Sequence, residues 1–490
     1  MAVYTITMIV YLVVILFVGL YVQKKLVKSK ADFWNAGAKL GLLVSAGTVS
    51  ATFISGGSLV GYPSSYFSSQ GFAAPWHMLG TILGWIIIVN FFVHKIRRTN
   101  HTTLVDLFAE RYGNGARIAA AIITLYAAGC YIVMNAAGVG AILSIVLGWN
   151  WHFSIILGFA IIIIYTTVSG YLGVVWTDVV QFFVLLLGTV LVAFFAVNAA
   201  GGFENIKETI INSDAFNWFY EYEGKNHAFP LQSRLRMTIQ FGIANLAYAP
   251  YYVRILSAKD EIVARNSFIF SGVIAIFVWV CLLCAAAAGA VLLPNLEVVN
   301  DNYIAVLITT SLPVFAGAIM ICGIVAAIMS SVDSFLHVAG VTVAKDLYQH
   351  RHPEATEKQL MTVTRVSIVA MGLICVLITL TNPASIFAIM VFLWGYIANG
   401  LAVPVICAFY WKRATHAGCV ASMIGGTVVH TVWYLLGKPL GLNEFFPGLI
   451  AAVLLMIVVS LCTKPSDAAV IEKFHGEHMK LRYTGKMPEY

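Results

Sequence analysis

Long runs of apolar residues follow one another along this chain and are separated by short polar segments. Runs such as 8–22 and 118–147 are continuous and do not alternate between apolar and polar positions. A helix rises about 1.5 Å per residue, so about 20 apolar residues cross a bilayer. Helices satisfy their own backbone polar groups in lipid, whereas a membrane barrel would need short alternating strands. The pattern therefore predicts an all-α, polytopic membrane protein.

The apolar runs predict thirteen transmembrane helices. Their expected bounds are 4–22, 41–69, 72–94, 117–147, 150–168, 175–200, 236–256, 266–294, 312–345, 363–381, 384–411, 416–436 and 446–462. The first run has no basic segment before it and no small-residue cleavage site after it. We therefore interpret it as a retained helix and not as a signal peptide.

Composition agrees with a lipid environment, because 60% of the 490 residues are hydrophobic and only 10% are charged. The runs leave no room for a separate soluble domain. We expect a single transmembrane domain over 1–463 and a short cytoplasmic tail over 464–490.

The basic residues predict the orientation of the chain. If the N-terminus lies outside, all but five of the 29 Lys and Arg residues fall in inside loops or in the tail, as expected for the inner membrane of a cell. The exceptions are Lys207, Lys225, Arg234, Arg236 and Lys438. The net charge of +7 is therefore a signal of topology, and it requires no nucleic-acid partner.

The eight cysteines lie in or at the ends of apolar runs. Cys281 and Cys284 have CxxC spacing but no neighbouring cluster of ligands, so we expect small buried side chains and neither a disulfide framework nor a bound cofactor. The histidines at 77, 152, 337 and 430 also lack metal-ligand spacing. No nucleophile or metal cluster points to an enzyme, and we expect no catalytic residue.

Two runs contain helix breakers where a plain lipid-facing helix would have none. The second contains Gly56 and Gly57 within the segment 51–58, and the seventh contains Pro250 at the end of the segment 245–250. Each run begins a possible five-helix half, at 41–200 and 236–411, and matching discontinuous helices are typical of transporters with inverted repeats. The alternative is that these residues only permit close packing or a kink.

The ninth run has a polar stripe on one face, because a helix advances about 100° per residue. Its members are Ala327, Ser330, Ser331, Asp333, Ser334 and His337. Hydroxyls on one helix and carbonyls freed by a broken neighbour are ligands that suit a hard cation such as sodium. The alternative is that each serine bonds back to the preceding turn of its own helix.

Two acidic residues within the runs are functional candidates, namely Asp178 and Asp333. Asp178 could instead be an N-terminal helix residue that interacts with the macrodipole. A proton-coupled carrier would use these two acids and His337 as a relay. A sensor built on such a bundle would need an added signalling domain, and the residues after Cys462 are too few to form one.

Several motifs resemble those of one transporter family. They are the segment 51–58, the segment 170–178 followed by Gln181, Arg254 with 258–260, the segment 326–331 followed by 345–348, and the segment 410–415 leading to Gly418. In these motifs the chain resembles the sodium:solute symporter family, which includes proline, pantothenate, sialic acid and galactose carriers. The resemblance runs from the first run to about the twelfth.

This resemblance implies a leucine-transporter-type fold, with two inverted five-helix repeats, a leading helix at 4–22 and trailing helices at 416–436 and 446–462. It also implies which residues of this chain form the ion site. The coupling sodium ion would be held by the carbonyls of Ala51, Ile54 and Ala327 and by the hydroxyls of Ser330 and Ser331. Asp178 would form a second sodium site or part of the exit path.

The same resemblance implies that a small organic solute binds beside the sodium ion. The residues expected around it are Gly57, Ser58, Asn245, Tyr248, Tyr131 and Trp394. The segments 51–55, 61–63 and 250–260 look most similar to the pantothenate branch. Phe53 replaces the acid that proline carriers have there, and Gly56-Gly57 replaces an acidic pair of sugar carriers. A carboxylate-bearing solute such as pantothenate is therefore expected, with a proline-like amino acid or a monocarboxylate as the alternative.

Overall fold

A computed structural model of the chain describes residues 2–65, 75–212, 231–294, 296, 303–381 and 386–480. These residues are almost entirely helical, and the one β-bridge among them joins Leu40 and Ala258. The prediction of an all-α protein is thus confirmed.

Eleven helical elements of the first half of the chain form part of the bundle. They are α1 (Ala2–Lys25), α2 (Lys30–Asn35), α3 (Leu42–Phe53), η2 (Gly57–Gly61), α4 (Tyr62–Ser65), α5 (Pro75–Ile87), η5 (Ile88–Phe92), α6 (Val93–Arg98), α7 (Leu104–Tyr112), α8 (Asn114–Leu147) and α9 (Trp151–Ala199).

The second half of the chain follows α10 (Gly202–Asn212). It contains α11 (Leu231–Ala244), η6 (Asn245–Ala247), α12 (Ala249–Ser257), α13 (Glu261–Leu292), α14 (Tyr303–Ser311), α15 (Val314–Val341), η7 (Thr342–Gln349), α16 (Glu357–Thr379), α17 (Ile386–Ile397), η8 (Ala398–Ala402), α18 (Val403–Tyr410), α19 (His416–Leu435), α20 (Phe445–Cys462) and α21 (Ala468–His475).

The described helices account for the predicted membrane spans. Ten are long and apolar enough to cross a membrane, and the pair 42–53 and 57–64, bent by 53°, makes an eleventh. The remaining two predicted spans correspond to the interrupted element α11–η6–α12 and to the second part of α9, which is 49 residues long and contains two predicted spans.

Gly170 divides α9 into those two parts. Its φ of 59° and ψ of −156° lie in a region that only glycine occupies readily. A Cβ atom built at this position would lie 2.5 Å from the Phe33 ring of α2. The chain therefore reverses its path at a residue that has neither the torsional restriction nor the volume of a side chain.

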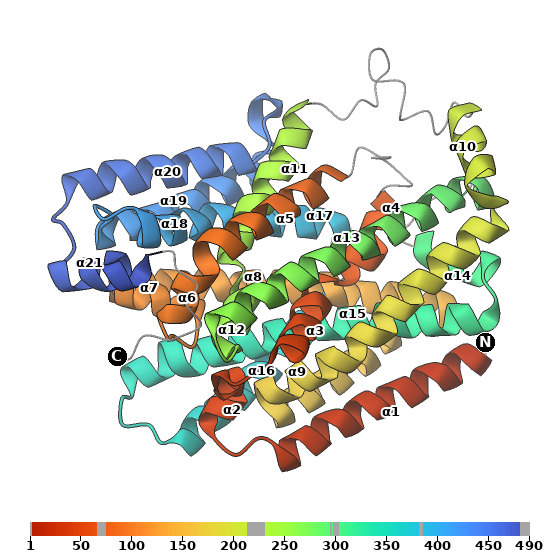
Figure 1. The fold of residues 1–490 in the computed structure, drawn as a ribbon, viewed down its shortest axis with the longest axis horizontal. Helices are drawn as coiled ribbons and strands as arrows, with labels where there is room; N and C mark the ends of the chain where they lie inside the picture. The colour runs from red at the N-terminus through yellow and green to blue at the C-terminus, as the bar shows by residue number, and fades with distance from the viewer. Residues whose placement is uncertain are drawn as a thin grey trace.

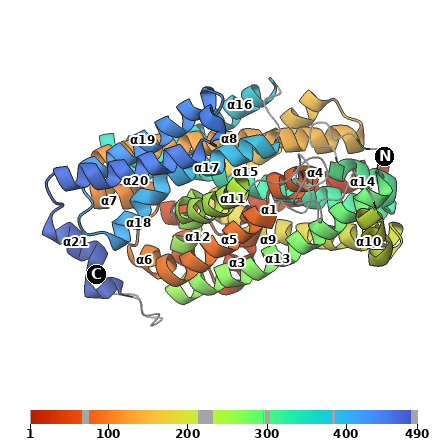
Figure 2. The ribbon, with the colours of Figure 1, turned by 90° about the horizontal axis from the view of Figure 1, so that it is seen from above.

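The long helices lie along the long axis of the molecule, with the two ends of the described chain near opposite ends of that axis (Figure 1). α15 packs against α9 and α8, and α1 packs against α9 and α15. α19 and α20 form a separate pair on the flank farthest from α1 in Figure 1, and Figure 2 shows α21 folded back beside the C-terminal end of α20. α15 is thus the central helix of the bundle, since 83% of its apolar window is buried.

Glycines allow α5 and α11 to approach each other closely, although they belong to different halves of the chain. A Cβ atom at Gly80 would meet the backbone of Thr238, and one at Gly84 would meet the backbone of Gly242 at 2.5 Å. Backbone that close to backbone cannot move aside for a side chain. The two helices therefore form a seam, Gly80–Gly84 against Thr238–Gly242, with no room for a larger residue.

We expect Gly170→Ala to lower the thermal stability of the purified protein. Alanine in this backbone region costs about 1 to 3 kcal/mol before its clash with Phe33 is counted. The matched control is Gly41→Ala, because a Cβ atom there meets nothing within 4 Å. Unfolding midpoints in detergent provide the measurement, and equal midpoints for the two variants would contradict the structural role of Gly170.

Candidate functional site

The break in the second predicted span lies where the sequence places it. α3 ends at Phe53, Ile54 is extended with φ −81° and ψ 96°, and the helix resumes at Gly57. The last carbonyls of a helix have no N–H partner four residues on. The carbonyls of Ala51 and its C-terminal neighbours are therefore available inside the bundle, away from water.

The hydroxyls of α15 meet these carbonyls. Ser330 donates to the carbonyl of Ala51 at 2.8 Å, and Ser331 donates to the carbonyl of Thr52 at 3.1 Å. Ser330 also lies 3.0 Å from the carbonyl of Ala327, so the bond back to its own helix exists beside the contact with α3. The structure thus brings Ala51, Ala327, Ser330 and Ser331 together, all fully buried.

Ile54, the remaining expected ligand, and Thr52 also lie at the end of α3. Ile54 is fully buried at the break, immediately after the last residue of α3. The carbonyl of Thr52 was not among the expected ligands. Those ligands follow from the positions implied by the family resemblance, and Thr52 is not one of them. Successive residues of a helix are rotated by about 100° about its axis, so neighbouring serines of α15 reach neighbouring carbonyls of α3, Ser330 that of Ala51 and Ser331 that of Thr52.

The seventh predicted span is also broken where expected. η6 covers Asn245–Ala247, Tyr248 is extended with φ −78° and ψ 103°, and α12 begins at Ala249 with Pro250 in its first turn. Proline has no N–H and is tolerated in that first turn. Both halves of the chain therefore begin with an interrupted helix.

Three of the residues expected around the solute form an aromatic cluster. The Tyr248 and Trp394 rings are stacked, with centroids 5.3 Å apart and an angle of 11°, and Tyr131 lies edge-on to Tyr248 at 6.1 Å. Phe335 contacts both tyrosines. All four side chains are buried, so in this conformation the rings pack against one another.

The other three expected solute residues lie beside the two breaks. Gly57 faces Met390 of α17, whose sulfur would lie 3.0 Å from an added Cβ atom. Asn245 donates to the carbonyl of Phe241 at 2.6 Å, and its Oδ1 atom has no partner among the described residues. Ser58 is buried in the first turn after the break, where its N–H donates to the carbonyl of Ser55.

Asn135 is a functional candidate that the sequence analysis missed. Its Oδ1 atom accepts from the N–H of Gly56 at 3.1 Å, and it is fully buried in the middle of α8. The signal was present, because an amide inside a transmembrane helix is costly unless it has a partner. It was hidden by the neighbouring apolar and small residues of the run 117–147.

Asp178 lies at the centre of a buried polar network. Its Oδ2 atom accepts from the Thr48 hydroxyl at 2.5 Å and pairs with Arg254 at 2.9 Å, while its Oδ1 atom has no partner among the described residues. It lies two turns inside the second part of α9, since that part starts after Gly170. The alternative that Asp178 serves the helix dipole is therefore wrong.

Arg254 was expected among the basic residues of an inside loop, and this expectation is wrong. The residue lies on α12, is 2% exposed, and donates to Asp178, to Ser334 at 2.8 Å and to the carbonyl of Thr48 at 3.1 Å. A buried guanidinium needs a carboxylate and further acceptors for its five N–H groups. Arg254 therefore joins α12 to α3, α9 and α15.

The acids and His337 do not form a direct relay in the described residues. Asp333 accepts from Tyr165 at 2.6 Å and from Ser334 at 3.3 Å. His337 Nε2 lies 2.9 Å from the carbonyl of Trp34, and its ring packs against Tyr171. Asp178 and Asp333 are thus linked through Arg254 and Ser334, whereas the bonded partner of His337 lies elsewhere.

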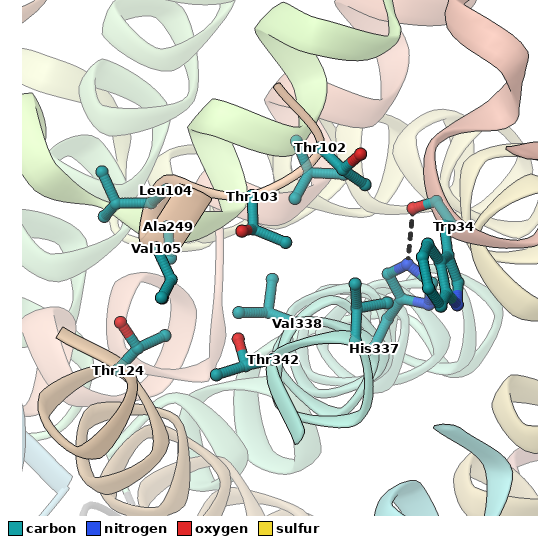
Figure 3. Close-up of a pocket in the computed structure, with 12 residues that line it drawn as sticks. Trp34, Thr102, Thr103, Leu104, Val105, Thr124, Ala249, His337, Val338 and Thr342 are labelled. Atoms are coloured by element: carbon teal, nitrogen blue, oxygen red, sulfur yellow. Dashed lines mark hydrogen bonds between the residues drawn. The ribbon is translucent and has the colours of Figure 1, made fainter. Parts of the chain in front are cut away.

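The C-terminal continuation of the polar stripe on α15 is closed. Figure 3 shows a small cavity, about 10 Å³, where Thr103 and Leu104 lie opposite His337, Val338 and Thr342. Thr103 donates to Asp346, and Lys345 pairs with Asp106 of α7. Burial alone would raise the pKa of Asp106, but the ammonium of Lys345, together with His101 and the N–H of Thr102, outweighs burial and lowers that pKa from its ordinary value. Charge therefore contributes to this closure.

The expected absence of a metal cluster can be compared with the described residues only. Among them, no group of three or more His, Cys, Asp or Glu side chains could hold a metal ion. The eight cysteines are free. Oxygens of carbonyls and hydroxyls remain the ligands available at the break in α3.

Solved structures share this fold. A Na+-coupled sialic acid symporter in a substrate-bound, outward-open state matches with a TM-score of 0.79 and 20% identity, over 95% of this chain and 99% of that one. Mhp1, a nucleobase-cation-symport-1 family transporter, closed with bromovinylhydantoin bound, matches with a TM-score of 0.58 and 15% identity, over 90% and 97%. The chain therefore has a leucine-transporter-type fold, with an interrupted helix at the start of each half.

Sequence comparison is more specific than the fold. A model of the sodium:solute symporter family matches residues 33–426, so the chain belongs to that family. Sodium/proline symporters of Staphylococcus aureus, for example in strains NCTC 8325 / PS 47 and N315, are 26% identical over 507 aligned residues. These alignments cover 94% of this chain and 93% of the relatives. They do not single out the pantothenate branch.

A double-mutant cycle can measure how strongly Arg254 and Asp178 depend on each other. We expect Arg254→Gln and Asp178→Asn each to reduce the free energy of unfolding by about 3 to 5 kcal/mol, because each leaves a buried partner uncompensated. The double variant should lose clearly less than the sum of the two. Unfolding midpoints of the purified proteins provide the measurement.

Arg111→Gln is the matched control for this cycle. Arg111 is also buried, but its partners are the Ser466 hydroxyl and the carbonyl of Ala414. Combined with Asp178→Asn it should give additive losses. Additive losses for Arg254→Gln with Asp178→Asn as well would show that the pair does not contribute to stability as a unit.

Proposed function

We propose that this protein is a sodium-coupled secondary active symporter that imports a small organic solute by alternating access. The observation that carries the proposal is the contact between the broken end of α3 and the hydroxyls of α15, at 2.8 and 3.1 Å. Membership of the sodium:solute symporter family supports sodium as the coupling ion.

The carbonyls of Ala51, Ile54 and Ala327 and the hydroxyls of Ser330 and Ser331 hold the ion in this proposal. Sodium prefers several oxygen ligands, and neutral ones bind it weakly enough for release. The hydroxyls now donate to carbonyls, so ion binding would rotate their protons away and turn their lone pairs toward the ion. The carbonyl of Thr52 is a further oxygen at the same place.

Asp178 serves the exit path rather than a second sodium site in our proposal. One of its carboxylate oxygens already pairs with the guanidinium of Arg254. A sodium ion that moves toward the cytoplasm would meet the second oxygen, which has no partner among the described residues. Ser334 lies between this carboxylate and the proposed sodium ligands, because it contacts both Arg254 and the carbonyl of Ser330.

The solute binds between the two breaks, near Gly57, Ser58, Asn245, Tyr248 and the rings of Tyr131 and Trp394. Two features favour a small carboxylate such as pantothenate. The start of the resumed helix after the break in α3 carries the positive end of a helix dipole, which favours an anion. The Oδ1 atom of Asn245 offers an acceptor for a hydroxyl or amide of the solute. The names of the curated relatives support proline as the alternative, and a monocarboxylate would fit the same features.

Alternating access follows from this geometry and from the charges. The N-terminus lies outside and the C-terminus inside in our proposal, in the inner membrane of the cell. Sodium from outside joins α3 to α15 and raises the affinity for the solute by roughly 1 to 3 kcal/mol. Inward movement of one charge down the membrane potential supplies about 2.3 kcal/mol per 100 mV. When the contacts of Thr103 and Lys345 open, the sodium ion and the solute are released to the cytoplasm.

Proton coupling is the alternative within the same fold. It would use Asp178, Asp333 and Tyr165, which the hydrogen-bond network connects, in place of the hydroxyl site. Replacing sodium by choline separates the two alternatives, because a proton-coupled carrier would keep its transport and a sodium-coupled one would lose it.

Sodium should stabilise the purified protein against heat, and Ser330→Ala with Ser331→Ala should abolish most of that effect. A ligand of the folded state stabilises it in proportion to the logarithm of its concentration over Kd. Loss of two ligands, at about 1 to 3 kcal/mol per lost partner, should raise the Kd for sodium by roughly thirtyfold or more, so the unfolding midpoint should begin to rise only at correspondingly higher sodium concentrations. The readout is the unfolding midpoint in sodium against potassium or choline.

The control for this experiment is Ser267→Ala. Ser267 is also buried, but its hydroxyl donates to Ala264 of its own helix. It should leave the response to sodium unchanged. An unaltered response of the double serine variant would place the ion elsewhere.

Paired acids and neutral analogues should identify the solute class. With sodium present, we expect pantothenate to stabilise the protein and its alcohol, pantothenol, to do so at least tenfold more weakly, since a lost charge-assisted hydrogen bond costs roughly 1.5 to 3 kcal/mol. Proline with prolinamide and lactate with lactamide test the alternatives in the same assay. Equal effects of acid and neutral partner throughout would exclude the carboxylate hypothesis.

A further inference from the structure

A cavity of about 470 Å³ lies between α8, α16, α17 and α19, away from the proposed ion and solute sites. Its floor is formed by Gly129 and Cys130 of α8 and by Cys375 of α16, whose thiol lies 3.7 Å from the carbonyl of Gly129. Ile389 and Phe392 of α17 form one wall, and Tyr434 of α19 forms another. We name this cavity the α8–α17 groove.

The groove opens toward the surface that faces lipid. At its mouth, Tyr126, Ile374, Ile378 and Leu435 are 45%, 54%, 48% and 74% exposed, whereas Cys375 on the floor is 1% exposed. Apolar side chains on the outside of a transmembrane bundle contact acyl chains. The groove therefore extends the hydrocarbon of the bilayer into the protein.

The size of the groove fits one acyl chain. A methylene group occupies about as much volume as a water molecule, roughly 30 Å³. The cavity of about 470 Å³ could thus hold about fifteen such groups. Its lining is mostly aliphatic and aromatic, and the hydroxyl of Thr431 is bonded to the carbonyl of Thr427 of its own helix.

A cation lies at the rim, where a phospholipid would place its phosphate. Lys438 follows the end of α19, its ammonium lies 5.5 Å from the centre of the Tyr434 ring, and its side chain is 45% exposed. It also bridges Glu444 at 3.5 Å, and Glu444 is nearly buried. The exposed side of the ammonium is therefore available to a headgroup.

We propose that the α8–α17 groove is a specific phospholipid site, which takes one acyl chain between α8, α16, α17 and α19 and places the phosphate beside Lys438. The position of α17 gives this site a connection to the solute site. Ile389 and Phe392 face the groove, and on the same helix Trp394 stacks on Tyr248. An acyl chain in the groove supports the wall whose other side carries the solute-site rings.

The test uses the full-length protein in bilayers that contain a phospholipid with a photoreactive diazirine on one acyl chain. After illumination and digestion, we expect adducts concentrated on residues 126–133 and 371–378. Gly129→Phe should reduce these adducts at least fivefold, because it fills the groove. An added Cβ atom there meets only Cys375 and Met371 at 4.0 Å, so the backbone accepts a side chain.

Ile122→Phe is the matched control, since Ile122 lies on the same helix and is 59% exposed outside the groove. It should leave the adducts unchanged. Lys438→Gln should reduce them roughly fivefold when the groove is intact, as expected for one cation near a lipid surface. Gel filtration confirms the fold of each variant, and retention of lipid in native mass spectrometry provides an independent readout.

Three outcomes would overturn the proposal. The first is adducts spread evenly over the lipid-facing helices, and the second is an unchanged pattern in folded Gly129→Phe. The third is crosslinking between protein copies through these residues, which would show that a second chain and not a lipid covers the groove. None of these outcomes bears on the sodium experiment, which uses α3 and α15.

Discussion

The structure depends on the need to satisfy carbonyl groups that a helix break frees inside a bundle surrounded by lipid. Water is absent there, and each unsatisfied backbone group costs several kcal/mol. The hydroxyls of Ser330 and Ser331 meet this need at the end of α3. They thereby tie the first broken helix to the central helix α15. The same arrangement makes the place suitable for a small cation, which satisfies carbonyls as well as a hydroxyl does.

A second buried interaction joins the other broken helix to the same bundle. Arg254 lies on α12, after the break in the second interrupted helix. Its partners Thr48, Asp178 and Ser334 belong to three other helices. A guanidinium with bonds in several directions fixes the relative position of those helices more closely than an ammonium would. In the alternating-access mechanism proposed above, we expect opening toward the cytoplasm to rearrange this guanidinium together with the contacts of Thr103.

The sequence was sufficient to predict both helix breaks and the serine pair, because glycines, a proline and hydroxyls are conspicuous in apolar runs. It also gave the spans, although it could not show that the fifth and sixth are one continuous element interrupted at Gly170. The place of Arg254 could not be read, since its neighbours Lys259 and Arg265 are typical of an inside loop. The stacking of Tyr248 on Trp394 depends on the packing of two distant helices. Periodicity within one helix carries no information about such packing.

The glycine seam between α5 and α11 has a consequence for how the halves of the protein can move. Two backbones without intervening side chains cannot slide past each other by changing rotamers, which is how ordinary packed helices accommodate shear. The close backbone contact of Gly80 and Gly242 therefore holds α5 and α11 in a fixed relative position. In the rocking motion proposed above, we therefore expect α5 and α11 to move together and the helix breaks to supply the hinges.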